Sequence, residues 1–158
     1  MLNLADQVGK ELMARGAKLA TAESCTGGWV AKAVTEVPGS SAWFDCGFVS
    51  YSNTAKQRML GVDPQVLEQS GAVSEAVVAQ MAEGAVANSD AHIAVAISGV
   101  AGPTGGSDEK PVGTVWFAWA IQGHPTVTCL SYFNGDRTSV REQAVEQALE
   151  GVLAYIPK

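Results

Sequence analysis

The sequence is short of the residues that most hydrolases use to activate water or a nucleophile. It contains two histidines, His92 and His124, and neither lies in an HExxH motif, which argues against a zinc hydrolase and a Ser-His-Asp triad. Its three cysteines, Cys25, Cys46 and Cys129, form no CxxC pair and support neither a disulfide framework nor a structural zinc site. We therefore expect no metal and no cofactor, and any hydrolytic chemistry needs another base.

Long hydrophobic runs and an excess of basic residues are also missing. No apolar run approaches the roughly 18 residues that span a bilayer, and the first residues, MLNLADQVGKELMARG, mix charges in helical spacing rather than forming a signal peptide. With 16 acidic and 10 basic residues the formal net charge is -6. This charge disfavours long-range attraction to nucleic acid or to an anionic membrane. We expect a cytoplasmic protein that binds neither, although one small basic pocket for an anion stays compatible with the charge.

Apolar material, in contrast, is plentiful, and its spacing predicts a single α/β domain over residues 1–158. Hydrophobic residues make up 47% of the chain, enough for a sizeable core. Helical periodicity predicts helices at residues 3–15, 29–37, 52–61, 75–89 and 138–156, with Gly61 closing the third helix and Ser74 as the N-cap of the fourth. Apolar and β-branched runs predict strands at residues 17–22, 42–51, 92–98, 114–121 and 126–133. Alternating strands and helices followed by a hairpin indicate a mixed, mostly parallel sheet of about five or six strands, with helices on both faces.

Three polar segments follow the first three predicted strands. They are TAESCTGG at residues 21–28, YSNTAK at residues 51–56 and SGVAGPTGG at residues 98–106. Ligands of such sheets gather beyond the carboxyl ends of the parallel strands. Because a structural turn rarely needs so many hydroxyl groups, we expect the three segments to converge in a functional site.

Each segment leaves alternatives open. Gly27 and Gly28 let the backbone approach a ligand, and the amides that open the next helix suit a phosphate or an oxyanion. The alternative is that Thr26 simply caps that helix. Lys56 is either a solvated surface lysine or a buried base whose pKa is lowered, and Tyr51 would face the same pocket.

The candidate nucleophiles are Ser24, Cys25, Ser41 and Ser98. Cys25 ionises most easily but has no well-placed histidine partner. Arg137 is a candidate phosphate anchor because a guanidinium binds two oxygens together, and its alternative role is a surface ion pair.

Several longer motifs carry a resemblance to a known family. They are AESCTGG at 22–28, PGSSAWF at 38–44, GFVSYSNTAK at 47–56, GAVSE at 71–75, SGVAGPTGGSDEKPVGTVWFA at 98–118 and GDRTSVR at 135–141. Over nearly its whole length the chain resembles the CinA C-terminal domain family, whose stand-alone members are nicotinamide-nucleotide amidases. The resemblance implies a three-layer α/β/α sandwich. It also implies metal-independent hydrolysis of the carboxamide of nicotinamide mononucleotide to nicotinate mononucleotide and ammonia.

The resemblance also assigns roles to residues. It implies a serine-lysine arrangement with Ser24 as nucleophile, Lys56 as base and Tyr51 beside them. The expected substrate contacts come from hydroxyl groups, loop glycines and one arginine: Thr26, Gly27, Gly28, Ser41, Ser98, Gly99, Gly102, Gly105, Gly106 and Arg137.

Three questions stay open at the level of sequence. Ser41 is a second choice of nucleophile, and the loop that holds the phosphate is not distinguished from the loop that holds the oxyanion. A cysteine amidase using Cys25 and an inactive nucleotide-binding or regulatory module are alternatives to the serine amidase. Four tryptophans and a broad apolar sheet also favour a homodimer.

Overall fold

The computed structural model describes all residues, 1–158, and is built on one five-stranded sheet with the strand order β2-β1-β3-β4-β5. β1 runs parallel to β2 and β3, whereas β4 runs antiparallel to both of its neighbours, so β4 is the one reversed strand. The predicted mixed, mostly parallel sheet is confirmed. The strands are β1 (Leu19–Glu23), β2 (Phe44–Val49), β3 (Ile93–Gly99), β4 (Thr114–Ile121) and β5 (Val127–Tyr132).

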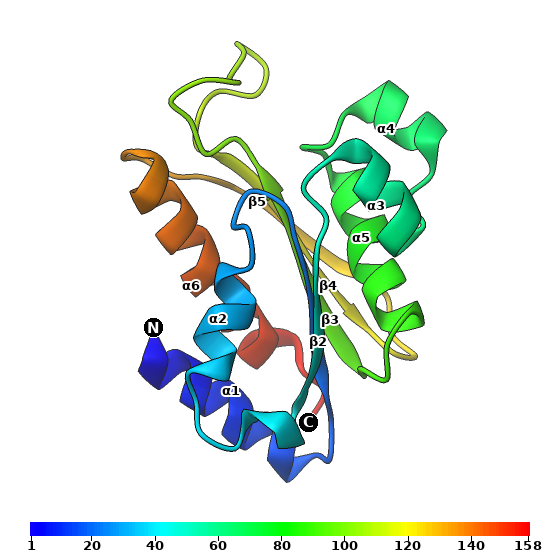
Figure 1. Ribbon diagram of the computed structural model, residues 1–158, viewed down its shortest axis with the longest axis vertical. Coiled ribbons are helices and arrows are strands. Elements are labelled where there is room, and N and C mark those ends of the chain that lie inside the picture. Colours follow the sequence, from blue (N-terminus) through cyan, green and yellow to red (C-terminus); the bar gives the residue numbers. More distant parts are fainter.

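Helices cover both faces of the sheet, as expected for a three-layer sandwich. One face carries α1, α2 and α6, and the other carries α3, α4 and α5 (Figure 1). Their bounds are α1 (Leu2–Ala14), α2 (Trp29–Thr35), α3 (Asn53–Leu60), α4 (Pro64–Ser70), α5 (Glu75–Ala87) and α6 (Arg137–Tyr155), and a short 3-10 helix, η1 (Ser40–Ala42), precedes β2. None of these helices is both long and apolar enough to cross a membrane.

The strand sequences divide the core into two unlike halves. Because side chains alternate along a strand, the larger residues of β1 and β3, such as Leu19 and Ile97, pack in the cluster that also holds buried residues of α1, α2 and α6. Alanines such as Ala22 and Ala96 occupy the opposite face and pack in the cluster that contains the buried side of α5. These small side chains let α5 lie close to the sheet.

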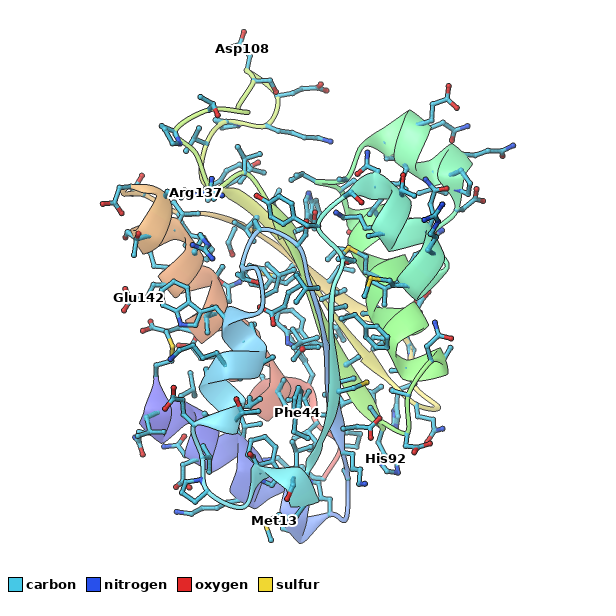
Figure 2. All side chains as sticks on the ribbon, viewed as in Figure 1. Met13, Phe44, His92, Asp108, Arg137 and Glu142 are labelled. Atoms are coloured by element: carbon cyan, nitrogen blue, oxygen red, sulfur yellow. The ribbon has the colours of Figure 1, made fainter.

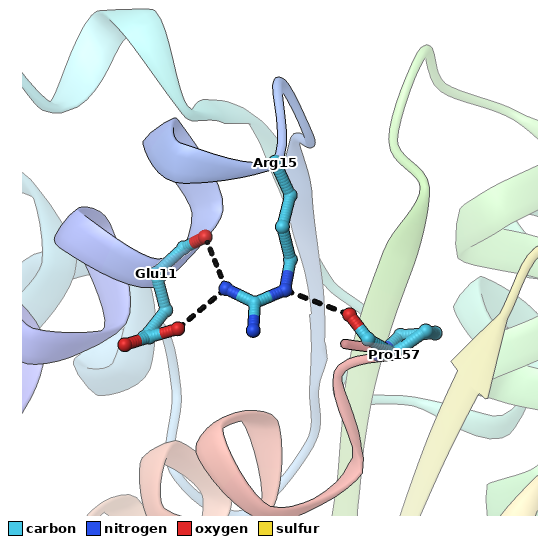
Figure 3. Close-up of polar contacts among 3 residues, drawn as sticks. All are labelled: Glu11, Arg15 and Pro157. Carbon is cyan, nitrogen blue, oxygen red and sulfur yellow. Dashed lines mark hydrogen bonds and ion pairs between the residues drawn. The ribbon is translucent and has the colours of Figure 1, made fainter.

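Polar contacts fix the chain at the end of the molecule opposite the functional segments. Arg15 follows α1 and donates from Nε to the carbonyl oxygen of Pro157 at 2.7 Å, which ties α1 to the C-terminal segment (Figure 3). Its Nη1 donates to the carbonyl oxygen of Glu11 at 2.9 Å and also contacts the Glu11 carboxylate. The carboxyl ends of β1, β2 and β3 lie at the opposite end of the sheet from this contact.

Local signals placed most elements to within a few residues, and two short elements were missed. Ser74 caps α5 as predicted, with its hydroxyl accepting from Val77 N, and Gly61 ends α3 with φ of 70°. α4 was not predicted from the sequence, although Asp63 at its N-cap and Pro64 in its first turn are an ordinary helix start. η1 was not predicted either.

Candidate active site

Ser24 and Lys56 meet at the carboxyl edge of the parallel strands. Ser24 directly follows β1 and is 8% exposed, and Lys56 lies in α3 and is 1% exposed. Lys56 Nζ is 2.9 Å from Ser24 Oγ. It also donates to the carbonyl oxygens of Ser50 at 2.9 Å and Tyr51 at 3.0 Å. Two of the three segments that were expected to converge, TAESCTGG and YSNTAK, are therefore in direct contact.

The surroundings of Lys56 favour the neutral amine. Burial lowers the pKa of Lys56, and the ion pairs of the protein include no partner for it. A neutral lysine has two N–H donors and one lone pair. If the carbonyl oxygens of Ser50 and Tyr51 take the two donors, the lone pair is directed at the Ser24 hydroxyl. This is the arrangement that a general base needs.

Cys25 is poorly suited to be the nucleophile. The side chain is 7% exposed, and burial raises the pKa of its thiol to about 11. A thiol in this state stays protonated near neutral pH, whereas the thiolate is the reactive form. The geometry therefore favours Ser24 over its neighbour.

Ser50 and Ser98 flank Ser24 on the neighbouring strands. Glu23 pairs with Val49 in β2 and with Ile97 in β3, so the next residue on each strand is a serine. Ser98 is 1% exposed, and the Ser50 hydroxyl is buried without a hydrogen-bond partner. Ser98 was predicted as a site residue and Ser50 was missed; the signal for Ser50 was its place one residue before Tyr51 at a strand end.

The turn between β1 and α2 is organised by Glu23. This residue is 1% exposed, and its carboxylate accepts from Thr26 Oγ1 at 2.6 Å, Val30 N at 2.8 Å and Ala31 N at 3.0 Å. Glu23 was not among the predicted site residues. The signal was an acid at the end of a buried strand.

The bonds of Glu23 correct two expectations about the start of α2. The amides of Trp29 and Lys32 donate to the carbonyl oxygens of Thr26 and Gly28, and Glu23 accepts from the two amides between them. The amides of Trp29, Val30 and Ala31 are therefore satisfied within the chain, so these three helical amides do not form a free anion site. Nor does the Thr26 side chain cap the helix, because its hydroxyl donates to Glu23 instead.

Arg137 joins Tyr51 to the glycine-rich loop. It is the first residue of α6, and Figure 2 shows it near the loop whose tip carries Asp108. Its Nη1 donates to the carbonyl oxygen of Gly102 at 2.7 Å, and its Nη2 donates to the Tyr51 hydroxyl at 3.3 Å. The exposed Tyr51 hydroxyl therefore contacts Arg137, and only the backbone carbonyl of Tyr51 contacts Lys56.

A cavity of about 490 Å³ lies on the other side of the Ser24 turn and carries two cations. It is lined by Thr26, Gly27, Gly28, Trp29, Lys32 and Arg141. Arg141 donates from Nε to the Cys25 carbonyl at 3.1 Å and from Nη2 to the Thr26 carbonyl at 3.2 Å, and its guanidinium lies 5.7 Å from the centre of the Trp29 ring. Arg141 was not predicted as a site residue, although it belongs to the GDRTSVR motif. Gly27 and Gly28 line the cavity with φ of 59° and 101°.

The remaining predicted residues are not all brought together. Ser41 is exposed in η1, ahead of β2, and so lies at the opposite end of the sheet from Ser24 within this chain. Gly99 ends β3 beside the site, and a Cβ there would come 2.7 Å from a Val115 methyl group. Gly105 and Gly106 lie in the exposed part of the glycine-rich loop, and no hydrogen bond joins them to Ser24 or Lys56.

Fold and site together define a three-layer α/β protein with a buried serine-lysine pair where its parallel strands end. The sequence matches the CinA C-terminal domain family over residues 1–156, and the chain belongs to this family. It is 57% identical over 150 residues to the nicotinamide-nucleotide amidohydrolase PncC of Escherichia coli (strain K12), covering 95% of this chain and 91% of the relative. The PncC of Pseudomonas putida is 54% identical over 150 residues, with 95% and 93% covered.

Solved structures agree with this assignment. The crystal structure of the competence/damage inducible protein CihA from Agrobacterium tumefaciens superposes with a TM-score of 0.94 at 45% identity, covering 97% of this chain and 93% of the other. At this identity the likeness extends beyond the fold to the sequence of a CinA-type domain.

Proposed function

We propose that the protein hydrolyses the carboxamide of nicotinamide mononucleotide to nicotinate mononucleotide and ammonia, with Ser24 as nucleophile and Lys56 as general base. The observation that carries the proposal is the buried Lys56 amine, whose Nζ lies 2.9 Å from Ser24 Oγ while carbonyl oxygens accept from it on its other side. The PncC relatives, named as nicotinamide-nucleotide amidohydrolases and similar over nearly the whole chain, support the choice of substrate.

In the first half of the reaction, Ser24 Oγ attacks the amide carbon while Lys56 accepts the hydroxyl proton. This step gives a tetrahedral oxyanion and an ammonium form of Lys56. The C–N bond then breaks as Lys56 returns the proton to the leaving nitrogen, which departs as ammonia and leaves an acyl-enzyme on Ser24. The carbonyl oxygens of Ser50 and Tyr51 stabilise the transient ammonium, because they accept from it throughout.

In the second half, water attacks the acyl carbon and Lys56 accepts its proton. The second tetrahedral oxyanion collapses, the bond to Ser24 Oγ breaks, and Lys56 returns the proton to the serine. The product leaves as the carboxylic acid, which gives its proton to solvent and becomes the carboxylate, and the active-site pair returns to its starting state. The Ser24 hydroxyl and the Lys56 amine are the only protein groups that change protonation in this sequence.

Unpaired backbone amides near Ser24 supply a candidate oxyanion hole. The amides of Ser24 and Gly27 are already used, since they donate to Ile97 O and Ser24 O at 3.0 Å each. The amides of Cys25 and Thr26 have no acceptor in the chain and follow the nucleophile directly. We assign the oxyanion to these two amides, an arrangement that costs no reorganisation when charge develops.

We assign the phosphate of the substrate to a position beside a cationic side chain. Arg137 is our first choice, because its guanidinium already links Tyr51 and Gly102 at the edge of the site. The Tyr51 hydroxyl would then bind substrate beside Arg137 rather than act on Lys56. The cavity lined by Lys32 and Arg141 is the alternative position for the phosphate. Cytoplasmic location and a homodimer remain predictions.

The proposal is tested by incubating purified protein with nicotinamide mononucleotide in the presence of a chelator and measuring ammonia. We expect ammonia from the wild type and none above background from Ser24→Ala, with both proteins folded by circular dichroism. Ser41→Ala serves as the comparison, because Ser41 is distant from Lys56 within the chain. Near-normal turnover by Ser24→Ala would refute the assignment, and loss in Ser41→Ala alone would transfer the role to Ser41. Binding of the nucleotide without release by the wild type would indicate a binding module.

A further inference from the structure

Glu23 is a buried acid that the proposed chemistry does not use. Its side chain is 1% exposed and forms none of the ion pairs of the protein. A buried carboxylate without a cation is costly unless its oxygens are fully hydrogen-bonded. Here one oxygen accepts from Thr26 Oγ1 and Val30 N and the other accepts from Ala31 N. A residue buried at this cost, one position before Ser24, requires an explanation.

We propose that Glu23 is a positioning residue that holds the turn after β1 so that Ser24 Oγ stays against Lys56 Nζ. The inference rests on the proposed role of Ser24 as nucleophile, and Glu23 itself does not contact the substrate. Its three bonds reach across the turn from the end of the strand to the first residues of α2. They fix the distance between the two elements that the Ser24 turn connects.

The turn needs such a fixed support because its own backbone is permissive. Gly27 and Gly28 both adopt left-handed conformations, and glycine resists displacement from such conformations less than other residues do. The rest of the turn is held on two other sides. Ser24 N donates to Ile97 O on the sheet side, and Arg141 donates to the carbonyl oxygens of Cys25 and Thr26. Glu23 supplies the connection to α2 that these contacts do not.

Replacing the carboxylate by an amide disturbs this support without changing its size. All three partners of Glu23 are donors, and a carboxylate accepts with both oxygens. In Glu23→Gln one oxygen becomes an NH2 group that must face an N–H or O–H donor. At least one of the three bonds is lost and the turn shifts. Because a displacement of about 1 Å can slow a reaction about 100-fold, the turnover number should respond strongly.

The experiment compares Glu23→Gln and Thr26→Val with the core variant Leu12→Ala. Thr26→Val removes only the hydroxyl bond to Glu23, and Leu12 is a fully buried residue of α1 at the other end of the molecule. For each protein we would measure melting temperature, kcat and KM for ammonia release. A second measurement is the rate at which an active-site fluorophosphonate modifies Ser24, followed by mass spectrometry, because it does not depend on the substrate.

We expect Glu23→Gln to lower kcat and the rate of Ser24 modification by about 10- to 100-fold while KM changes by less than about threefold. Thr26→Val should change both rates in the same direction and by less. Leu12→Ala should lower the melting temperature but leave kcat and Ser24 reactivity at the wild-type level. If Glu23→Gln is too unstable to study, Thr26→Val alone decides the matter, since wild-type rates in that variant would contradict the inference.

The outcomes separate the inference from the proposed function. A wild-type protein with a reactive Ser24, together with equally reactive Glu23→Gln and Thr26→Val variants, would overturn the positioning role and leave the nucleophile in place. Losses of kcat in proportion to melting temperature across all three variants would also overturn it. A wild-type Ser24 that the fluorophosphonate does not modify, with no ammonia released, would overturn both proposals.

Discussion

Replacement of Lys56 by methionine removes the proposed base while keeping a long, unbranched side chain in the same buried position. Lys56 is 1% exposed, and its amine contacts Ser24 Oγ and the carbonyl oxygens of Ser50 and Tyr51. General-base catalysis contributes about 10²- to 10⁴-fold. Because the same amine also protonates the leaving nitrogen, we expect Lys56→Met to reduce kcat by about 10⁴-fold.

The same substitution has opposing effects on stability. Methionine leaves the two carbonyl oxygens without their donor, at a cost of about 1–3 kcal/mol for each buried acceptor left unsatisfied. It also removes an amine whose charged form is disfavoured by burial. These effects offset one another, so near neutral pH the free energy of unfolding should change by less than about 3 kcal/mol.

The sign of the pH dependence follows from the lowered pKa of Lys56. Between this value in the folded protein and about 10.4 in the unfolded chain, the unfolded state binds more protons. The Lys56 contribution to the free energy of unfolding therefore rises with pH across this window, by at most about 1.4 kcal/mol per pH unit, and is constant on either side. The free-energy cost of burying the charged Lys56 amine is present in full below the pKa of the folded state and absent above the pKa of the unfolded state.

The assay is urea unfolding of wild type and Lys56→Met from about pH 7 to about pH 11, together with ammonia release. Lys10→Met is the control, because Lys10 is an exposed lysine of α1 paired with Asp6. The difference in unfolding free energy between wild type and Lys56→Met should increase with pH, and the Lys10→Met difference should lack this rise. A pH-independent difference for Lys56→Met would contradict the lowered pKa of Lys56, and turnover within tenfold of wild type would contradict its role as general base.

Two further predictions concern the phosphate and the thiol. Arg137→Gln should raise KM about tenfold, as expected for loss of a charged hydrogen bond, and leave kcat within about twofold, whereas Lys32→Gln should leave KM unchanged. A rise in KM confined to Lys32→Gln in steady-state assays, with Lys10→Gln as the charge-matched control, would move the phosphate into the cavity lined by Lys32 and Arg141. Cys25 should resist iodoacetamide near neutral pH, because burial raises its pKa to about 11; inactivation within minutes that substrate prevents would instead favour a cysteine mechanism.

Much of the fold could be predicted because its signals are local. The buried strands and the caps at Ser74 and Gly61 appear in short stretches of sequence, and the structure bears them out. α4 was missed because seven residues are too few for hydrophobic periodicity to stand out, even with a good start at Asp63. η1 has no such periodicity at all.

The candidate site was predictable where topology determines it. Residues that follow parallel strands lie at the same end of the sheet, and this rule predicted that Ser24 and Lys56 lie close together. The same rule explains why Ser41 lies elsewhere, since it precedes a strand rather than following one. The directions in which individual side chains point could not be predicted from the sequence. The hydroxyl of Tyr51 contacts Arg137, and Arg141 reaches back to the turn from a distant helix.

The acid in TAESCTGG shows why the phosphate could not be placed from sequence. Glycines at the start of a helix indicate an anion site, and the structure does hold an anion there, but it is the carboxylate of Glu23. A ligand phosphate at the same amides would have to displace a buried, three-times hydrogen-bonded group. We therefore expect side-chain cations to bind the phosphate, and the candidates are Arg137, which contacts Gly102 and Tyr51, and the pair Arg141 and Lys32 in the cavity beside this turn. A net charge of -6 is compatible with such a local anion site, because three cationic side chains lie near the proposed nucleophile's turn and the glycine-rich loop.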